Sequence, residues 1–387
     1  MSDLKIFAKT IEPEAREQIE RLLAQKPFAH CKVRIMPDVH AGAGCVIGFT
    51  ANLGDKVIPN IVGVDIGCGM LTIGLGPIGV DCARLDEVIR QFVPVGMAVH
   101  QQPEHIPLVD QLLCRGRLRN VEWLHSSLGT LGGGNHFIEL DADEDGNKYL
   151  IIRTGSRNLG NQVAKIYQDL AIQTLHSVSG ERTALIRRMK AEGREREISQ
   201  ALASLENTCT IPRELCYVEE ENRVAYLHDM RLCQQFACQN RSRIASTILE
   251  HMGWQSVEQF ETIHNYIDDQ GMVRKGAVSA AAGKLLLIPI NMKDGCIIGR
   301  GLGNPDWNES APHGAGRLMS RAKARELIPM EAYQASMTGI YTTSICRETL
   351  DEAPQAYKPM EEILACISDT VQVLKIIKPI YNFKAGD

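Results

Sequence analysis

Two residues with metal-binding side chains lie close together in a glycine-rich segment. Residues 63–70 read Gly-Val-Asp-Ile-Gly-Cys-Gly-Met and follow an apolar run that predicts a buried strand. Asp65 offers a hard oxygen and Cys68 a soft thiolate that can bridge two ions, a pair that favours a borderline divalent metal over calcium or magnesium. The glycines let the backbone approach a ligand closely. Taken alone, the segment fits an inert buried cysteine at a strand end equally well.

Three histidines from distant segments extend this candidate site. His136 follows a glycine run that opens into a strand, His264 stands in Ile-His-Asn-Tyr, and His313 precedes Gly-Ala-Gly. Each of them alone is more typical of a structural histidine. Together with Asp65 and Cys68 they supply nitrogen, oxygen and sulfur ligands from separated segments, which is the usual construction of a metal site in an enzyme.

The elements that must position these residues are strands and helices in mixed order. The patterns predict helices over 12–25, 84–92, 159–176, 181–205, 222–252, 330–338 and 359–377, and strands over 31–35, 45–51, 70–75, 149–153, 262–267, 272–279, 285–292 and 296–300. Residues 36–44 form a turn-rich segment and 380–387 a short tail. A helix beginning with 317–325 is expected to direct its free amides toward the contacts of His313.

The expected fold class is therefore α+β, with a mixed β-sheet core, surrounding helices and an inserted helical lobe. The candidate ligands lie on both sides of the mostly helical stretch 157–255. For this reason we expect a single domain over 1–387.

Composition argues against a membrane-spanning protein, a secreted protein and a protein that coats nucleic acid indiscriminately. No apolar run approaches the roughly 18 residues of a membrane span, and the N-terminus does not resemble a signal peptide, so we expect a soluble, cytoplasmic chain with no membrane partner. The 12 cysteines form no regular framework, as in proteins with reduced thiols. A net charge of -5 argues against indiscriminate coating of nucleic acid, so a phosphate-binding surface must come from clustering. Arg115, Arg117 and Arg119 form either such a basic edge or a solvated loop.

No familiar nucleotide-binding signature is present. The chain contains neither Gly-x-x-x-x-Gly-Lys-Ser/Thr nor a strand-turn-helix Gly-x-Gly-x-x-Gly. If a nucleotide binds, it must be bound by a site without either of these motifs.

Eight segments in one order carry a family resemblance. They are Met-Pro-Asp-Val-His, Gly-Val-Asp-Ile-Gly-Cys-Gly-Met, Gly-Gly-Asn-His-Phe-Ile-Glu, Thr-Gly-Ser-Arg, His-Asn-Tyr, Arg-Lys-Gly-Ala, His-Gly-Ala-Gly-Arg and a near-terminal Lys. Over essentially its full length the chain resembles the RtcB family of GTP-dependent RNA ligases. The family joins RNA ends that carry a 2′,3′-cyclic phosphate or 3′-phosphate to 5′-hydroxyl ends, using manganese and GTP, in RNA repair or tRNA splicing.

The resemblance implies a role for each matching residue. His313 would attack the α-phosphate of GTP and carry GMP as a phosphoramidate, and one or two Mn2+ ions would be held by Asp65, Cys68, His136 and His264. The nucleotide would be bound by Asn135, His136, Phe137, Ile138, Glu139, His264, Asn265, Pro289, Ile290, Asn291, Met292, Cys296, His313, Gly314, Ala315, Gly316 and Lys384. RNA or phosphate would be contacted by Arg153, Arg157, Lys275, Arg317 and Arg321. An accessory activator protein is a further candidate partner.

The chain departs from the family pattern at two places. Arg153 stands where the family has a metal-ligating histidine; arginine has no lone pair to donate and would repel a second cation. The family's Pro-Gly-Ser-Met is replaced by Pro289-Ile290-Asn291-Met292, and a second serine by Cys296. These differences indicate a divergent branch, in which metal count or end specificity differs.

Three hypotheses for the function follow. The first is an active RNA ligase that forms guanylyl-His313. The second is a metal-dependent enzyme that opens cyclic phosphates and seals little, and the third is a catalytically silent relative that binds RNA or nucleotide.

Overall fold

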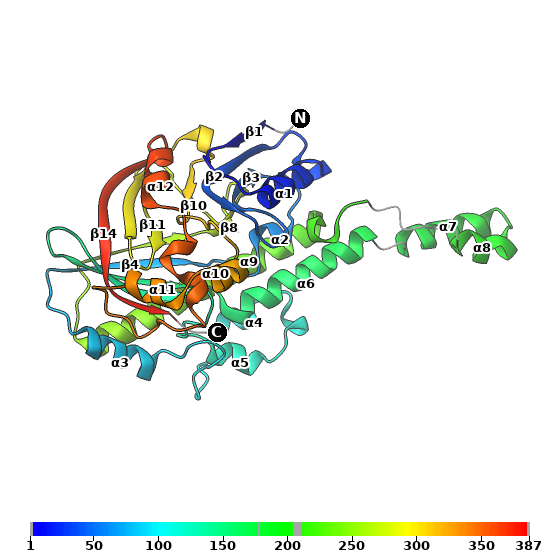
Figure 1. Ribbon diagram of the computed structural model, residues 1–387. Coiled ribbons are helices and arrows are strands. Elements are labelled where there is room, and N and C mark those ends of the chain that lie inside the picture. The colour runs from blue at the N-terminus through cyan, green and yellow to red at the C-terminus, as the bar shows by residue number, and fades with distance from the viewer. Residues whose placement is uncertain (1–2, 177–178, 204–209, 385–387) are drawn as a thin grey trace.

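The computed structural model describes residues 3–176, 179–203 and 210–384. A large sheet forms the centre of the molecule (Figure 1). Its strand order is β11 (Leu285–Asn291), β12 (Gly295–Gly301), β14 (Val371–Lys384), β5 (Phe137–Ala142), β6 (Lys148–Thr154), β4 (Gly69–Gly76) and β7 (Glu258–Ile263). All neighbours in it are antiparallel. The two outer strands approach each other, because the backbone N–H of Leu287 donates to Thr262 Oγ1 over 3.1 Å.

Two smaller sheets lie against the central one. The first has the order β1 (Asp3–Ile6), β2 (Lys32–His40), β3 (Ile47–Asn52), β9 (Met272–Lys275) and β8 (Asn265–Ile267), and the second pairs β10 (Ala277–Ser279) with β13 (Ser310–Pro312). The chain passes from β7 of the central sheet directly into β8 of the five-stranded sheet. The residue between these two strands, His264, therefore stands at the junction of the two sheets.

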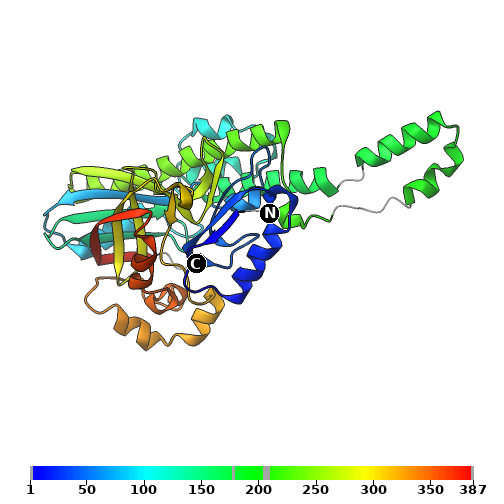
Figure 2. The same ribbon diagram turned by 90° about the horizontal axis from the view of Figure 1, so that it is seen from above.

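Helices cover the sheets and extend to one side. They are α1 (Pro13–Leu23), α2 (Pro59–Val62), α3 (Cys82–Phe92), α4 (Pro107–Asp110), α5 (Val121–Ser126), α6 (Arg157–His176), α7 (Ser179–Ala191), α8 (Ile198–Ala203), α9 (Glu220–Met252), α10 (Arg321–Leu327), α11 (Met330–Ser336) and α12 (Met360–Ile367). Short 3-10 turns lie at Lys26–Phe28, Arg115–Arg117, Glu195–Glu197, Arg213–Leu215, Pro305–Trp307, Leu350–Glu352 and Pro354–Ala356. Figures 1 and 2 both show α6 leading out of the body toward α7 and α8, which stand away from it.

The long helix α9 is the main support of the site loops. The side-chain oxygen of Asn240 accepts hydrogen bonds from the N–H groups of Gly129 and Thr130, and Arg241 donates to the carbonyls of Gly67 and Thr154. Both side chains are completely buried. Buried polar groups need such partners, so α9 fixes three loops at once.

The α+β class with a sheet core and surrounding helices is confirmed, and the helices predicted near residues 12–25, 84–92, 159–176, 222–252 and 330–338 are present. Each cysteine in the described part of the chain is a free thiol, as expected. Among the described residues there is no helix that is both long and apolar enough to cross a membrane.

The prediction of one helix over 359–377 followed by a tail is wrong. Helix α12 ends at Ile367, and Val371–Lys384 is a strand between β12 and β5. The β-branched residues Val371, Val373, Ile376 and Ile377 fit a pleated sheet, and the neighbouring strands provide their packing, which helical spacing alone did not indicate.

Other predicted boundaries also change. The helix expected from residue 317 begins only at Arg321, where the Ser320 side chain caps it, so its amides start eight positions after His313 and do not serve that residue. Residues 36–40 continue strand β2 where a turn was expected. The predicted strands over 262–267 and 272–279 are interrupted at His264 and Gly276, and α7 and α8 replace one helix over 181–205, of which 204–205 lie outside the described residues.

Candidate functional site

Antiparallel pairing brings the candidate ligands to one edge of the central sheet. Gly69 at the start of β4 pairs with Thr154 at the end of β6 and with Ile263 at the end of β7. Phe137 at the start of β5 pairs with Arg153 near the end of β6 and with Lys384 at the end of β14. The residues just beyond these strand ends, namely Cys68, His136 and His264, therefore gather at the same edge.

Asp65, Cys68 and His136 form a compact group that could hold a metal ion. One ligand atom from each lies within 4.8 Å of the others. His136 Nε2 is 3.0 Å from Asp65 Oδ2 and 3.7 Å from Cys68 Sγ, while its Nδ1 donates to the carbonyl of Leu131 over 2.9 Å. A metal-binding histidine characteristically has its second nitrogen held in this way, so the donor set fits a transition-metal ion.

The electrostatics of this group agree with its use as a ligand set. Burial would raise the pKa of the Asp65 carboxyl, but the hydrogen bond and charge of His136 outweigh it and lower the pKa to about 2. Burial and the Asp65 charge raise the pKa of the Cys68 thiol. Since the thiolate is the ligand form, a bound cation would have to displace this proton.

His264 lies beside this group and next to His313. Its backbone N–H donates to the carbonyl of Cys68 over 3.0 Å, and its ring centre is 4.7 Å from that of His313. The ring is buried, and its Nδ1 has no hydrogen-bond partner among the residues that the structure describes. Burial and the neighbouring His313 hold the pKa of His264 well below its usual value, so the ring is neutral and able to donate a lone pair.

His313 is held in one orientation by a buried acid. Asp38 Oδ2 lies 2.6 Å from His313 Nδ1 and accepts a second hydrogen bond from the His313 backbone N–H over 3.0 Å. Asp38 is completely buried on β2, and His313 follows β13. With Nδ1 donating to the carboxylate, the lone pair resides on Nε2, as a nucleophilic imidazole requires. Gly316 makes this approach possible, because a Cβ atom there would lie 2.4 Å from the carbonyl oxygen of Asp38.

A cavity of about 410 Å3 opens beside His313. Of the predicted nucleotide-binding residues, Asn135, Phe137, Glu139, Pro289, Ile290, Asn291, Met292, His313, Gly314, Ala315, Gly316 and Lys384 line it. His136, Ile138, His264, Asn265 and Cys296 do not. The size suits a nucleotide.

Strand alternation explains why Ile138 is excluded. Phe137, Glu139, Arg153, Asn382 and Lys384 lie on one face of the sheet, where they line the cavity. Ile138 points to the opposite face and is fully buried in an apolar cluster with Leu140 and Ile152. Its side chain therefore belongs to the core.

Asn265 and Cys296 stand behind the cavity wall. The Asn265 amide donates to the backbone carbonyl of Asp65 and accepts from the N–H of Gly276, so it braces the metal-binding loop. Cys296 is fully buried and donates weakly to Glu139 Oε1 over 3.7 Å. Both residues act on the site through a neighbour.

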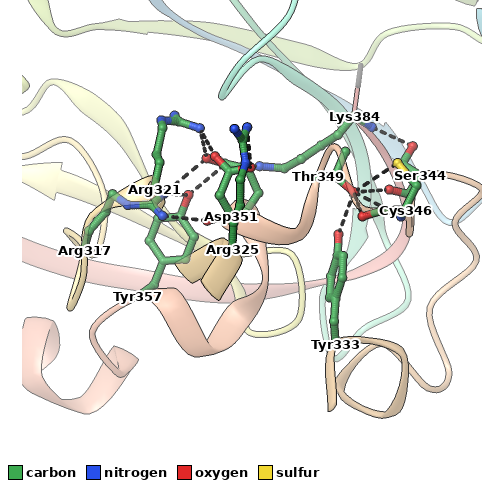
Figure 3. A network of polar contacts seen from close by, with 11 residues as sticks. Arg317, Arg321, Arg325, Tyr333, Ser344, Cys346, Thr349, Asp351, Tyr357 and Lys384 are labelled. Carbon is green, nitrogen blue, oxygen red and sulfur yellow. Dashed lines mark hydrogen bonds and ion pairs between the residues drawn. The ribbon is translucent and has the colours of Figure 1, made fainter. Parts of the chain in front are cut away.

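A buried acid collects the cations at one end of the cavity. Glu352 accepts from Lys384, from Arg317 over 3.2 Å and from Tyr357 over 2.7 Å, and it forms an ion pair with Arg321 at 2.8 Å. Figure 3 shows Arg321 of α10, Arg317 of the preceding loop, Lys384 at the end of β14 and Tyr357 after the turn Pro354–Ala356 directed toward one another. Burial would raise the pKa of Glu352, but the charges of Lys384 and Arg321 lower it. The cations are thus fixed in place before any ligand binds.

The predicted RNA- or phosphate-contacting residues differ in availability. Lys275 is buried, and its ammonium donates to the carbonyls of Ala43 and Asn60, so it ties two loops together. Arg157 donates to Thr130 Oγ1 over 3.1 Å, with its guanidinium 3.5 Å from His136 Nδ1. Arg153 lines the cavity, and its Nε has no partner. Of the three, Arg153 is the one whose charge faces the cavity.

A second group, Glu139, Asp141 and Cys296, also has ligand atoms within 4.8 Å of one another. The Asp141 side chain is completely buried, and its carboxyl lies against that of Glu139. Burial and the nearby Glu139 raise the pKa of Asp141 well above its usual value. A proton retained on this carboxyl pair accounts for its burial, since two like charges at this separation cannot both be ionised at low cost.

Four residues of the site were not among the sequence-predicted contacts. Asp38 and His40 lie in the Met-Pro-Asp-Val-His segment, which carried the family resemblance without a role for either acid or imidazole. Burial lowers the pKa of His40 to about 4, so it faces the cavity as a neutral ring. Glu352 and Asn382 carried no sequence signal, because their roles depend on partners that are distant in the chain.

We expect Gly155→Ala to weaken metal binding. A Cβ atom at residue 155 would lie 2.0 Å from Asp65 Oδ1, so the carboxylate must move. Displacing a group that orients ligands typically lowers metal affinity about 10- to 100-fold. Calorimetric titration with Mn2+ measures the change, and Gly79→Ala, whose Cβ would meet nothing within 4 Å, is the control. Equal affinities in the two variants would contradict the assignment of Asp65.

We expect Asp141→Asn to remove a pH-dependent loss of stability. Above the usual pKa of an aspartate the unfolded chain releases this proton and the folded chain keeps it, so folding stability falls as pH rises. The advantage of the variant in unfolding free energy should grow between pH 5 and 8 by up to about 1.4 kcal/mol per pH unit. Urea unfolding at each pH measures it.

Asp143→Asn is the matched control for this experiment. The pKa of Asp143 is lowered to about 2 by Asn147 and Lys375 against the effect of burial, so its contribution does not change from pH 5 to 8. If the difference in unfolding free energy between Asp141→Asn and the unaltered chain stayed constant from pH 5 to 8, Asp141 would be ionised in the folded protein.

Comparison with known proteins shows the family of this chain. The family described as tRNA-splicing ligase RtcB matches residues 18–123 and 109–385. The chain is 31% identical over 416 residues to RNA-splicing ligase RtcB1 of Escherichia coli strain ATCC 25922 and to RNA-splicing ligase RtcB of strain K12, in each case covering 97% of this chain and 95% of the relative. It is 24% identical to tRNA-splicing ligase RtcB of Pyrobaculum aerophilum, covering 89% and 85%. The chain belongs to the RtcB family.

Proposed function

We propose that this protein is an RNA ligase that uses GTP to join a 2′,3′-cyclic phosphate or 3′-phosphate end of RNA to a 5′-hydroxyl end. The relatives named above are RNA- and tRNA-splicing ligases. The observation that carries the proposal is the pair of His313 and Asp38, whose 2.6 Å contact leaves Nε2 as the nucleophilic nitrogen at the wall of a nucleotide-sized cavity.

In the first step His313 Nε2 attacks the α-phosphorus of GTP. A P–N bond forms, the bond from the α-phosphorus to the bridging oxygen breaks, and pyrophosphate leaves. The Nδ1 proton stays on the ring, and the buried Asp38 stabilises the positive charge that develops there. Holding the ring rigidly from behind also limits the reorganisation needed for attack.

In the next steps a 3′-phosphate oxygen of RNA attacks the guanylyl phosphorus, and the P–N bond breaks. The 5′-hydroxyl then attacks the activated 3′-phosphate, its proton passes to solvent, and GMP leaves. A cyclic phosphate must first be opened by water to the 3′-phosphate. Each step is a nucleophilic displacement at phosphorus, so the cations at the cavity wall can stabilise phosphate charge in all of them.

Asp65, Cys68, His136 and His264 are the residues proposed to hold manganese. Such an ion would neutralise phosphate charge and activate the incoming oxygen. The orphaned Nδ1 of buried His264 and the fixed tautomer of His136 support this assignment. Arg153 supplies a positive charge nearby, since it lowers the pKa of the Cys68 thiol against the effects of burial and Asp65. We assign Arg153 to a nucleotide or RNA phosphate, with one firmly held ion beside it.

Glu139, Asn135 and Lys384 are proposed to bind GTP. Glu139 shares the cavity wall with Asn382, whose amide donates to Glu139 and whose Oδ1 is buried without a partner. The Glu139 carboxylate and this carbonyl oxygen are hydrogen-bond acceptors, which suits the N–H groups at the edge of guanine. Lys384 Nζ lies 5.7 Å from the centre of the Phe137 ring and donates to Glu352, so its position at the cavity wall is fixed.

Incubation with α-labelled GTP and Mn2+ tests the covalent step. The intact chain should acquire label that withstands denaturation, and His313→Ala should lose it, because the substitution removes the Nε2 atom that forms the P–N bond. His40→Ala is the control, since its ring lines the same cavity without contacting the carboxylate of Asp38. If the intact chain acquires no label, hydrolysis of a cyclic phosphate would indicate an end-processing enzyme and its absence a silent RNA- or nucleotide-binding relative.

Asp38→Asn tests how His313 is activated. The amide can donate to His313 Nδ1 and so favour the tautomer with the proton on Nε2, which removes the nucleophilic lone pair. We expect the rate of labelling to fall at least about 100-fold while GTP affinity changes little. Single-turnover labelling and equilibrium binding of GTP separate the two effects. Loss of affinity with an unchanged rate would assign Asp38 to the nucleotide site.

A further inference from the structure

A polar groove of about 500 Å3 lies along α6, outside the cavity of His313. One wall is the stripe Asn158, Asn161, Gln162 and Lys165 of the helix, in which Asn161 and Lys165 are exposed and the other two half-buried. The other wall carries Arg117 and Arg119. The stripe follows the helical spacing i, i+3, i+4 and i+7, so these side chains lie in one row. Groups of this kind, cations mixed with amides, bind the phosphates and sugars of nucleic acids.

The groove carries a local positive charge in a chain whose net charge is -5. Arg117, Arg119 and Lys165 are exposed, and none of them forms an ion pair with any residue that the structure describes; Asp169 is the one acid in the lining. Neighbouring Arg115 differs, because Asp110 neutralises it at 2.7 Å. The unpaired cations are therefore available to an external polyanion.

The wall that carries the arginines is rigidly attached to the helix. The Gln162 side chain accepts from the backbone N–H of Arg119 over 2.7 Å and donates to its carbonyl over 3.1 Å. Buried Asp229 of α9 accepts from the N–H groups of Leu113 and Cys114 and from the Tyr167 hydroxyl of α6. The positions of the cations are thus set in advance, which lowers the entropic cost of binding.

The groove lies next to the candidate metal centre. Arg157 is the first residue of α6, and its guanidinium lies 3.5 Å from His136 Nδ1. Asn158 follows directly and is part of the groove lining. At 1.5 Å per residue, Lys165 lies about 12 Å from Arg157 along the helix axis. Figure 1 shows α6 running outward from the body at this point. An RNA strand whose reacting end lies at the candidate metal centre can therefore continue along α6.

We propose that the α6 groove binds the phosphodiester backbone of one RNA strand next to its reacting end. Arg117, Arg119 and Lys165 contact phosphates, and the amides of Asn158 and Asn161 contact sugar or phosphate oxygens. This recognition is independent of sequence, since it reads the backbone alone. It rests on the proposed RNA ligase function, for which it defines the path of the substrate.

The test is RNA binding by the full-length chain, measured by fluorescence anisotropy with a labelled single-stranded RNA at several salt concentrations. The combined variant Arg117→Ala, Arg119→Ala and Lys165→Ala should bind at least about tenfold more weakly, and the slope of log affinity against log salt should fall by about 2, as expected for three lost contacts. Arg115→Ala, which removes a neutralised arginine, should bind like the unaltered chain. An equal affinity and salt slope in the combined variant would overturn the proposal.

Labelling of His313 by GTP distinguishes this proposal from the proposed function. The reaction takes place without RNA, so the combined variant should label at the unaltered rate, which also shows that it folds. Should it fail to label, the milder variant Arg119→Gln and Lys165→Gln replaces it; a salt slope lowered by about 1 supports the groove, and an unchanged slope overturns it. If the combined variant binds RNA weakly and the intact chain acquires no label, the RNA-binding groove is supported and the proposed ligase function is rejected.

Discussion

Antiparallel pairing within the central sheet is the constraint on which the site depends. Because β7, β4, β6, β5 and β14 alternate in direction, the residues that follow or precede them meet at one edge. Cys68, His136, His264 and Lys384 are far apart in the chain and come together only through this register. A slip of one residue would turn Glu139 into the core and Ile138 into the cavity, so the register also decides which side chains can reach a ligand.

Buried charges in this site are stabilised by fixed partners. Asp38 Oδ2 accepts from two N–H groups of His313, and Glu352 is paired with four cationic or hydroxyl donors. Arg241 is paired with Glu261 and donates to the carbonyls of two site loops. An isolated charge at such depth would be costly, and pairing makes its burial acceptable. The consequence is a preorganised site, in which nucleophile and cations already hold their positions.

Local sequence patterns predicted some features well and others poorly. Helices with a clear apolar stripe, such as α1 and α3, could be found because their own residues define the buried face. Strand β14 was predicted as a helix, since its support comes from β12 and β5, which no local pattern displays. Lys275 was predicted to contact RNA, but its ammonium is bound by carbonyls of two other segments. For both β14 and Lys275, the residues that determine the observed structure are distant in the sequence.

The sequence by itself determined the chemical inventory: a carboxylate, a thiol and imidazoles in glycine-rich segments, in an order that resembles one family. Those residue types and their neighbours are local properties, and a chain carries them wherever it folds. Only the tertiary structure decided that Asp38 stands behind His313, that Glu352 gathers the cations, and that Arg117, Arg119 and Lys165 line one groove. These relations are distances between remote segments, and strand register and helix packing set them.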